Sequence, residues 1–311
     1  MSLQFATSYH DYPFPAFTSK GPYLCRDLEP WLGCPFWLQP TDPRLIDIHN
    51  GEPAPTPQLE NLEGMIHYWQ ENPEWMDFLN PNSPVHKDKL LERGLYLDFW
   101  GEYIKPRQRV LDVGSGVGRF AQVFWEQESE VQIIDPDLRS LWRNLTYSVE
   151  QKGSIDLHWG TIETLPDLGL FDIVAACEVF NYIEDPKLGI ANIHRSLPSG
   201  GILLFSVEAR WGWAMSSDVA VGSLDAFLET GIIHIPHDRW IRTFTQKQIE
   251  ELLSEFEILK IQPSHYSLSG PFEMIIEEPT LEELLQTEEK LRNHPVSANL
   301  NRAWMVVAQK K

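Results

Sequence analysis

Apolar and polar positions along the middle of the chain follow the rhythm of short strands separated by amphipathic helices. Five short, mostly apolar runs predict strands, at residues 109–113, 131–135, 156–159, 172–177 and 202–207. The segments between them have the spacing of helices, at residues 118–128, 137–151 and 187–196. Strands that lack polar alternation are buried on both faces, which is typical of a parallel sheet between two helical layers. The pattern therefore predicts a doubly wound α/β fold.

Regular elements also flank this region. Residues 86–104 predict a helix, whose apolar stripe contains Leu90, Leu91, Leu95, Leu97, Phe99 and Tyr103. Two later strands, 256–262 and 303–309, are expected to end the sheet as an antiparallel edge, with the last strand antiparallel. Between them, residues 280–292 predict a helix. Its acidic positions in 277–289 are expected to face solvent, while Leu281, Leu284 and Leu285 face inward.

Two segments interrupt this regularity. Fourteen of the 23 prolines precede Val110, and the first 85 residues also carry many aromatic side chains, so 1–85 is expected to be an ordered but irregular extension. A short helix is expected within it at 59–69. The domain proper is assigned to 86–311, and its long insert 209–243 is expected to form a cap. The extension is expected to reach over the carboxyl edge of the sheet, with a structural wrap on the far side or a contact with a second subunit as alternatives.

Composition narrows the possible partners. The chain has 25 Lys and Arg against 45 Asp and Glu, a formal net charge of −20, which disfavours nucleic acid and anionic membranes. No apolar stretch is long enough for a membrane helix, and no signal peptide is visible. The three cysteines, Cys25, Cys34 and Cys177, suit neither a disulfide framework nor a metal knuckle. We therefore expect a cytoplasmic protein without a metal site.

The stretch most informative about chemistry is VLDVGSGVGRF, at residues 110–120. A predicted strand ends near Asp112, and Gly114, Gly116 and Gly118 form the turn into a helix, where the backbone can approach a ligand closely. The same glycine pattern would also fit a tight β-α turn that binds no ligand. However, the spacing is D-x-G-x-G-x-G, which differs from the dinucleotide fingerprint G-x-G-x-x-G. Asp135 ends the next predicted strand, where a carboxylate can accept hydrogen bonds from both hydroxyls of a ribose.

At this point residues 86–311 resemble the class I S-adenosylmethionine-dependent methyltransferases, specifically a small-molecule, type 11-like methyltransferase domain with a Rossmann-like sheet. The segments that carry the resemblance are VLDVGSGVGRF, IIDPD, WGTIETLP, FDIVAACEVFNYIEDP, LPSGGILLFSV and RTFTQKQIEELLSEFEILKI. The resemblance implies S-adenosylmethionine as the cofactor. It also implies a cofactor site formed by Asp112, Gly114, Ser115, Gly116, Gly118, Asp135, Pro136, Thr161, Ile162 and the backbone of Cys177.

The sequence departs from the family pattern at two places. Thr161 stands where an acid usually reaches the adenine amino group, so the backbone N–H of Ile162 is the alternative contact. Asn181 and Tyr182 replace an acid and a histidine after the fourth strand. A role that the family assigns to that histidine therefore does not carry over to this chain.

Methyl transfer mainly requires alignment, and a general base is needed only where the acceptor is protonated. The candidate acid-base residues are His234, His237 and Tyr182, with Asp238 able to orient a histidine, although both histidines could also be ordinary loop residues. Pro236 disfavours a metal site at this pair. The candidate pocket residues are Glu178, Trp211, Trp213 and Trp240, although the tryptophans would equally suit the core of a cap. The Cys177 thiol is expected to be inert.

These observations favour methyl transfer to a small organic molecule. Two alternatives stay open: methylation of a protein, and a cofactor-binding protein that does not methylate and serves as a scaffold or regulator. The acceptor, the methylated atom and the oligomeric state are not specified by the sequence, and a homodimer is one possibility for the last.

Overall fold

The computed structural model describes residues 16–18, 21–23, 78–79, 81, 83–136, 140–141, 144, 155–214, 224–234, 240–268, 272 and 278–311. The helix expected at 59–69 and most of the one expected at 137–151 lie outside these residues. The positions described in the latter, Ser140, Leu141 and Asn144, are helical.

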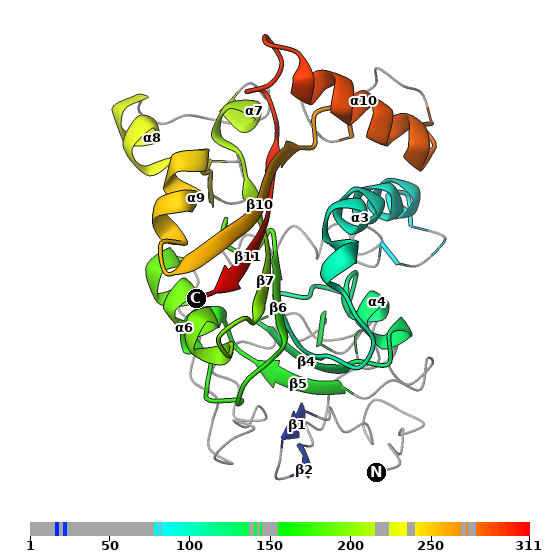
Figure 1. Cartoon of the computed structure of the whole chain (residues 1–311), viewed down its shortest axis with the longest axis vertical. Helices are drawn as coiled ribbons and strands as arrows, with labels where there is room; N and C mark the ends of the chain where they lie inside the picture. The colour runs from blue at the N-terminus through cyan, green and yellow to red at the C-terminus, as the bar shows by residue number, and fades with distance from the viewer. Residues whose placement is uncertain are drawn as a thin grey trace.

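A seven-stranded sheet forms the centre of the molecule (Figure 1). In spatial order it consists of β10 (Phe256–Ser264), β11 (Ala303–Lys310), β7 (Ile202–Glu208), β6 (Ile173–Cys177), β3 (Arg109–Val113), β4 (Glu130–Asp135) and β5 (Ile155–Trp159). The five central predicted strands are confirmed and run parallel. β11, the last strand of the chain, is antiparallel to both its neighbours, as expected, and it lies between β7 and the edge strand β10.

Helices cover both faces of this sheet. Figure 1 shows α3 (His86–Trp100) and α4 (Ala121–Glu126) on one side, and α6 (Pro186–Ser196) and α9 (Gln246–Leu252) on the other. Alternate residues of β3 serve the two cores: Val110 packs with the α3 and α4 side, whereas Leu111 packs with the α6 and α9 side. Because both faces are buried, the strands are mostly apolar and lack a polar face, which explains the sequence pattern.

Short polar residues fix where the helices begin. Asp185 caps α6 by accepting hydrogen bonds from the backbone N–H groups of Lys187 and Leu188. Thr245 begins α9 in a reciprocal capping box with Gln248. Thr280 begins α10 (Leu281–Asn293) in the same manner, with Glu283 as its partner.

Two helical faces differ from the expectation. α3 ends at Trp100 and continues as the short 3-10 helix η2 (Gly101–Tyr103). Its buried side chains are Glu92, Leu95, Tyr96, Phe99 and Trp100. Of the predicted stripe, Leu97 and Tyr103 are partly buried against the core, whereas Leu90 and Leu91 belong to no core cluster, so the stripe was wrong at these two positions. In α10, Leu284 is buried as expected, but Leu281 is 38% exposed and Glu288 is buried. Each helix buries one carboxylate, Glu92 in α3 and Glu288 in α10, because this carboxylate accepts hydrogen bonds from buried donors.

The insert after β7 contains α7 (Arg210–Ala214), α8 (Leu224–Thr230), β8 (Ile232–His234) and β9 (Trp240–Arg242). β8 and β9 pair antiparallel, and Trp213, Phe227, Ile233 and Ile241 form a small core of their own. In the N-terminal extension, β1 (Ala16–Thr18) pairs antiparallel with β2 (Gly21–Tyr23), and β1 lies beside β5. Among the described residues, no helix is long and apolar enough to cross a membrane.

Candidate functional site

The glycine-rich turn follows β3 at the carboxyl edge of the sheet. Gly114, Gly116 and Gly118 have positive φ angles of 61°, 55° and 98°. A Cβ atom on Gly114 would lie 2.4 Å from Val179 Cγ2, and one on Gly118 would lie 2.4 Å from Asn144 Oδ1. A Cβ atom on Gly116 would meet no atom of the described residues within 4 Å. Gly114 and Gly118 are therefore required for packing, whereas Gly116 leaves backbone open to a ligand.

Asp135 lies directly against this turn. It ends β4, the parallel neighbour of β3, and its Oδ2 accepts a hydrogen bond of 2.9 Å from the backbone N–H of Gly116. Pro136 follows and is half-buried. The structure thus brings the first two predicted cofactor motifs together at one edge of the sheet, although they are separated by many residues in the chain.

Hydrogen bonds of polar side chains fix the glycine-rich turn. Ser115 Oγ donates to Asn144 Oδ1 at 3.2 Å, and Asn144 Nδ2 donates to the Gly116 carbonyl at 2.6 Å. Asp112 is buried, and its Oδ2 has no hydrogen-bond partner among the described residues. Burial raises the pKa of Asp112 to about 7. A positively charged or N–H-bearing ligand group nearby would favour the ionised form of this carboxyl.

The turn after β5 is rigid. Thr161 begins the 3-10 helix η3 (Ile162–Thr164), and its hydroxyl and N–H are both paired with Thr164. Asn192 of α6 donates to the Ile162 carbonyl at 2.7 Å. The Thr161 hydroxyl therefore caps the short helix η3. The family resemblance did not predict this role.

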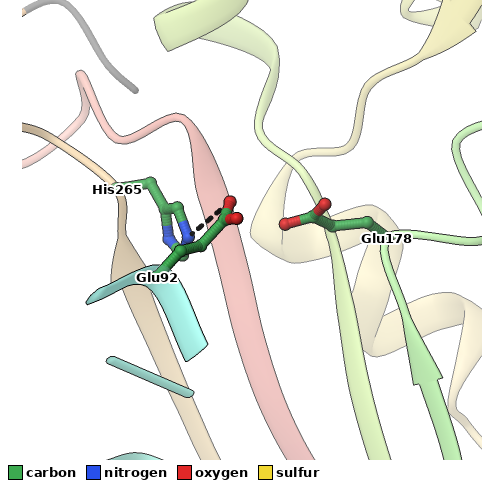
Figure 2. A group of neighbouring side chains, drawn as sticks. All are labelled: Glu92, Glu178 and His265. Atoms are coloured by element: carbon green, nitrogen blue, oxygen red, sulfur yellow. Dashed lines mark ion pairs between the residues drawn. The ribbon is translucent and has the colours of Figure 1, made fainter. Parts of the chain in front are cut away.

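A buried network of charged side chains adjoins the turn, and sequence reasoning missed most of it. Arg119 follows Gly118 directly, and its guanidinium donates to Glu92 of α3 at 2.6 Å. The same guanidinium lies 3.7 Å from Oε2 of Glu178, which follows β6. Lys89 also pairs with Glu92, at 2.7 Å. Figure 2 shows that the side chains of Glu92, in α3, and Glu178, which follows β6, point toward each other.

His265 completes the group in Figure 2, with its Nε2 3.4 Å from Glu92 Oε1. Burial alone would lower the pKa of His265, but the Glu92 carboxylate outweighs burial and raises it above the usual value. Burial likewise opposes ionisation of Glu92, yet Lys89 and Arg119 hold its pKa well below the usual range. Glu92, Glu178 and His265 could in principle ligate a metal, since their ligand atoms lie within 4.8 Å of one another. However, protein cations already pair with Glu92 there.

Tyr96 and Cys177 line the same network. The Tyr96 hydroxyl donates to Glu178 Oε1 at 2.6 Å, and burial raises its pKa well above the usual value, so it stays a donor. Cys177 ends β6 and accepts hydrogen bonds from Arg119 at 3.2 Å and from Ser206 at 3.3 Å. Burial raises the pKa of Cys177 to about 12, which keeps it a thiol and explains why it should be inert.

A second carboxyl group ends the adjacent strand. Glu208 ends β7 and accepts a hydrogen bond from Trp213 Nε1, while burial raises the pKa of Glu208 to about 7. Arg302 lies 3.4 Å above the Trp213 ring. Asn181 links the two strand ends: its Oδ1 accepts from the Glu208 backbone N–H at 2.9 Å, and its Nδ2 donates to the Glu178 carbonyl at 3.2 Å.

The remaining predicted residues are distributed over the insert. Trp213 is buried in the cap core, and Tyr182 packs against that core. Trp211 is 47% exposed and contacts Phe227 edge-on. His234 and Trp240 lie on β8 and β9, facing each other in register, but their side chains are outside the described part of the structure, as is all of His237. Their roles stay predictions.

Comparison with known proteins gives the family. A family profile described as "Methyltransferase domain" matches residues 72–258. Curated relatives named ubiquinone biosynthesis O-methyltransferase include one from Rickettsia canadensis, 26% identical over 49% of this chain and 63% of its own. Another, from Idiomarina loihiensis, is 32% identical over 44% of this chain and 56% of its own. The chain thus spans less than two thirds of the length of these relatives.

Solved structures share the fold at low identity. The PH0226 protein of Pyrococcus horikoshii superposes with a TM-score of 0.56 and 16% identity, over 79% of this chain and 99% of that one. The [4+2]-cyclase SpnF superposes with a TM-score of 0.53 and 18% identity, over 82% and 97% of the two chains. Because the matched profile covers more than half of the residues, the chain belongs to the class I S-adenosylmethionine-dependent methyltransferase family.

Proposed function

We propose that this protein transfers the methyl group of S-adenosylmethionine to a small organic molecule. The observation that carries the proposal is the turn at Gly116, whose open backbone lies against the Asp135 carboxylate in a chain of this family. Backbone without a Cβ atom leaves room for a close ligand, and a carboxylate at the end of β4 can accept hydrogen bonds from ribose hydroxyls. The relatives named O-methyltransferase also support a small-molecule acceptor.

The described residues fit this cofactor. The Gly114, Gly116 and Gly118 turn would hold the methionine end. Asp112, at the end of β3 before this turn, is buried, and its Oδ2 has no hydrogen-bond partner among the described residues. Asp135 would bind the ribose, and the adenine would lie between Pro136 and the Ile162 backbone N–H. S-adenosylmethionine, when bound, supplies an electrophilic methyl group on a positively charged sulfur.

The chain's own contribution is alignment and exclusion of water. Glu178 and Glu208 follow or end adjacent parallel strands, β6 and β7, at the carboxyl edge where ligands of such sheets bind. The insert 209–243 would form one wall, with Trp211, Trp213 and Trp240 as candidate lining residues. His234, His237 and Tyr182 remain the candidate acid-base groups. The negative net charge supports a small-molecule acceptor over nucleic acid.

The decisive experiment has two steps. Calorimetry should first show that the protein binds S-adenosylmethionine. Cofactor labelled in its methyl group is then incubated with the protein and a metabolite extract, a protein fraction or RNA. Label in a small molecule supports the proposal, and label in protein or RNA contradicts the acceptor class.

The alternative of a cofactor-binding protein that does not methylate has one specific support. A protein named as a [4+2]-cyclase has the same fold, so this fold alone does not establish methyl transfer. Cofactor binding without label transfer to any fraction would favour that alternative.

A further inference from the structure

We propose that Glu178 is the acceptor-recognising residue of this site, that Glu92 positions it through Arg119, and that the pair selects neutral acceptors bearing a hydroxyl group. The proposal rests on the methyl-transfer function proposed above. It concerns the charged network that lies beside the glycine turn, and it gives Glu178, a candidate pocket residue, a specific role.

Glu178 lies next to the glycine turn, at the carboxyl edge of the sheet where the acceptor would bind. It follows Cys177, the last residue of β6, and β6 is the parallel neighbour of β3, which leads into the glycine turn. The next residue, Val179, closely approaches Gly114, because a Cβ atom on that glycine would lie 2.4 Å from Val179 Cγ2. The Glu178 side chain is therefore adjacent to the turn that would hold the methionine end of the cofactor.

The backbone of Glu178 is held in an unfavourable conformation. Its φ angle of +59° is in the left-handed region, which is unfavourable for a residue with a side chain. Its backbone N–H is fixed by the Ser206 carbonyl at 3.1 Å and by Ser206 Oγ at 3.0 Å. His265, which faces the same network, has a φ angle of +60°. Two such residues in one cluster are typical of a functional site.

Glu178 is the accessible end of the carboxylate-arginine chain that begins at Glu92. Its side chain is 24% exposed, against 6% for Glu92 and 10% for Arg119. Tyr96 donates to one of its oxygens at 2.6 Å, and Arg119 lies 3.7 Å from the other. Each carboxylate oxygen has two lone pairs, so both oxygens keep capacity for a further donor.

Charge balance favours a neutral donor over a cation. The Glu92 and Glu178 carboxylates are matched by Lys89 and Arg119. The Glu208 carboxyl, which interacts with Glu178, has Arg302 as its own cationic neighbour. An ammonium group entering here would add charge to a site that has no negative excess. A hydroxyl group brings the hydrogen that Glu178 can accept and brings no charge.

Glu92 acts on Glu178 indirectly, through Arg119. Its carboxylate pairs with Arg119 at 2.6 Å and lies 3.4 Å from His265, and in this way it ties the arginine to α3. Arg119 and Tyr96 then hold the Glu178 carboxylate in one orientation. Glu92 is thus a positioning residue, whose effect on an acceptor should depend on an intact Glu178.

A ligand-binding cycle tests this contact. The protein is saturated with S-adenosylhomocysteine, and calorimetry measures its affinity for catechol and for 1,2-dimethoxybenzene, which lacks the hydroxyl hydrogens. We expect the wild-type protein to bind catechol at least tenfold more tightly. Glu178→Gln should remove most of this preference and change the affinity for the ether less than twofold. Additive effects of the ligand change and the residue change would mean that the two groups do not touch.

Further variants separate positioning from contact. Glu92→Gln and Tyr96→Phe should each reduce the catechol preference by about threefold to tenfold, and neither should reduce it further when combined with Glu178→Gln. Glu128→Gln, at an exposed ion pair, is the matched control and should leave the preference unchanged. Tyr96→Phe retains the carboxylate and remains informative if Glu178→Gln does not fold.

The outcomes distinguish this inference from the proposed function. Failure of the wild-type protein to bind S-adenosylhomocysteine would contradict the proposed function itself. Binding of S-adenosylhomocysteine without a preference for catechol, or tighter binding of benzylamine than of catechol, would overturn only the assignment of Glu178 to a neutral hydroxyl acceptor.

Discussion

The guanidinium of Arg119 lies 2.6 Å from the carboxylate of Glu92, and both side chains are buried. Arg119 follows the glycine turn and Glu92, 27 residues earlier in the chain, belongs to α3, so the pair fastens this turn to the helix. Buried charge pairs are costly to desolvate and are stable only when both partners are present. This pair therefore holds the helix and the turn in one fixed relation.

Glu92→Ala should destabilise the protein strongly, because it leaves Arg119 and Lys89 without their shared carboxylate. Loss of one partner of a buried pair typically lowers the free energy of unfolding by about 3–5 kcal/mol. The matched control is Glu128→Ala, which removes an exposed partner of Arg107 and should have little or no measurable effect. Urea unfolding of both variants checks the prediction. Equal stabilities would show that the buried pair contributes nothing.

Two glycines of the turn should respond differently to the same substitution. Gly114→Ala forces a Cβ atom to within 2.4 Å of Val179 and should lower the unfolding temperature markedly. The Cβ atom of Gly116→Ala would meet no atom of the part of the chain that the structure describes, so the substitution should cost only the strain of a positive φ angle, about 1 kcal/mol. It should nevertheless weaken S-adenosylhomocysteine binding at least tenfold. Wild-type affinity in a folded Gly116→Ala protein would place the ligand elsewhere.

Asp135→Ala should weaken S-adenosylmethionine binding by about one to two orders of magnitude. The physical reason is the loss of a charge-assisted contact with two ribose hydroxyls. Calorimetry provides the measurement, and Asp98→Ala, which removes an exposed carboxylate of α3, serves as the control. Unchanged affinity in the Asp135 variant would remove the ribose assignment.

Asp112 should make stability depend on pH in the absence of ligand. Burial raises its pKa to about 7, above the value of about 4 in an unfolded chain. A raised folded-state pKa contributes stability that is complete below pH 4 and is lost as the pH rises through 7. The unfolding temperature of Asp112→Asn relative to wild type should therefore be higher at pH 8 than at pH 5. An equal difference at both pH values would show that Asp112 does not titrate in this range.

The parts of the fold that could be predicted were those governed by local pattern. Val110 and Leu111 point to opposite cores, so both faces of β3 are apolar and the strand is visible in the sequence. Thr245 was recognisable as a cap because its partner Gln248 is only three residues away. The glycine turn and Asp135 were found for the same reason: each follows an obvious strand.

Most of the charged network could not be found in this way. Glu92 lies in a helix, where a charged residue normally marks the solvated face, and its partners Arg119 and His265 come from distant elements. Glu288 was placed in solvent by the same rule, yet it accepts hydrogen bonds from the backbone N–H groups of Tyr266 and Ser267. Only tertiary structure brings these donors and acceptors together. A positive φ angle at a non-glycine residue, as at Glu178, also leaves no signal in the sequence.

The N-terminal extension provides the last prediction. Its aromatic residues, including Trp31 and Trp37, are costly to expose to water, so the extension should cover another surface. If it closes over the carboxyl edge of the sheet, deletion of residues 1–58 should abolish turnover and leave a folded core that still binds S-adenosylmethionine. Circular dichroism and calorimetry check the core, and methyl transfer from labelled cofactor checks turnover. Normal methylation by the truncated protein would place the extension outside the active site, as expected for a structural wrap on the far side.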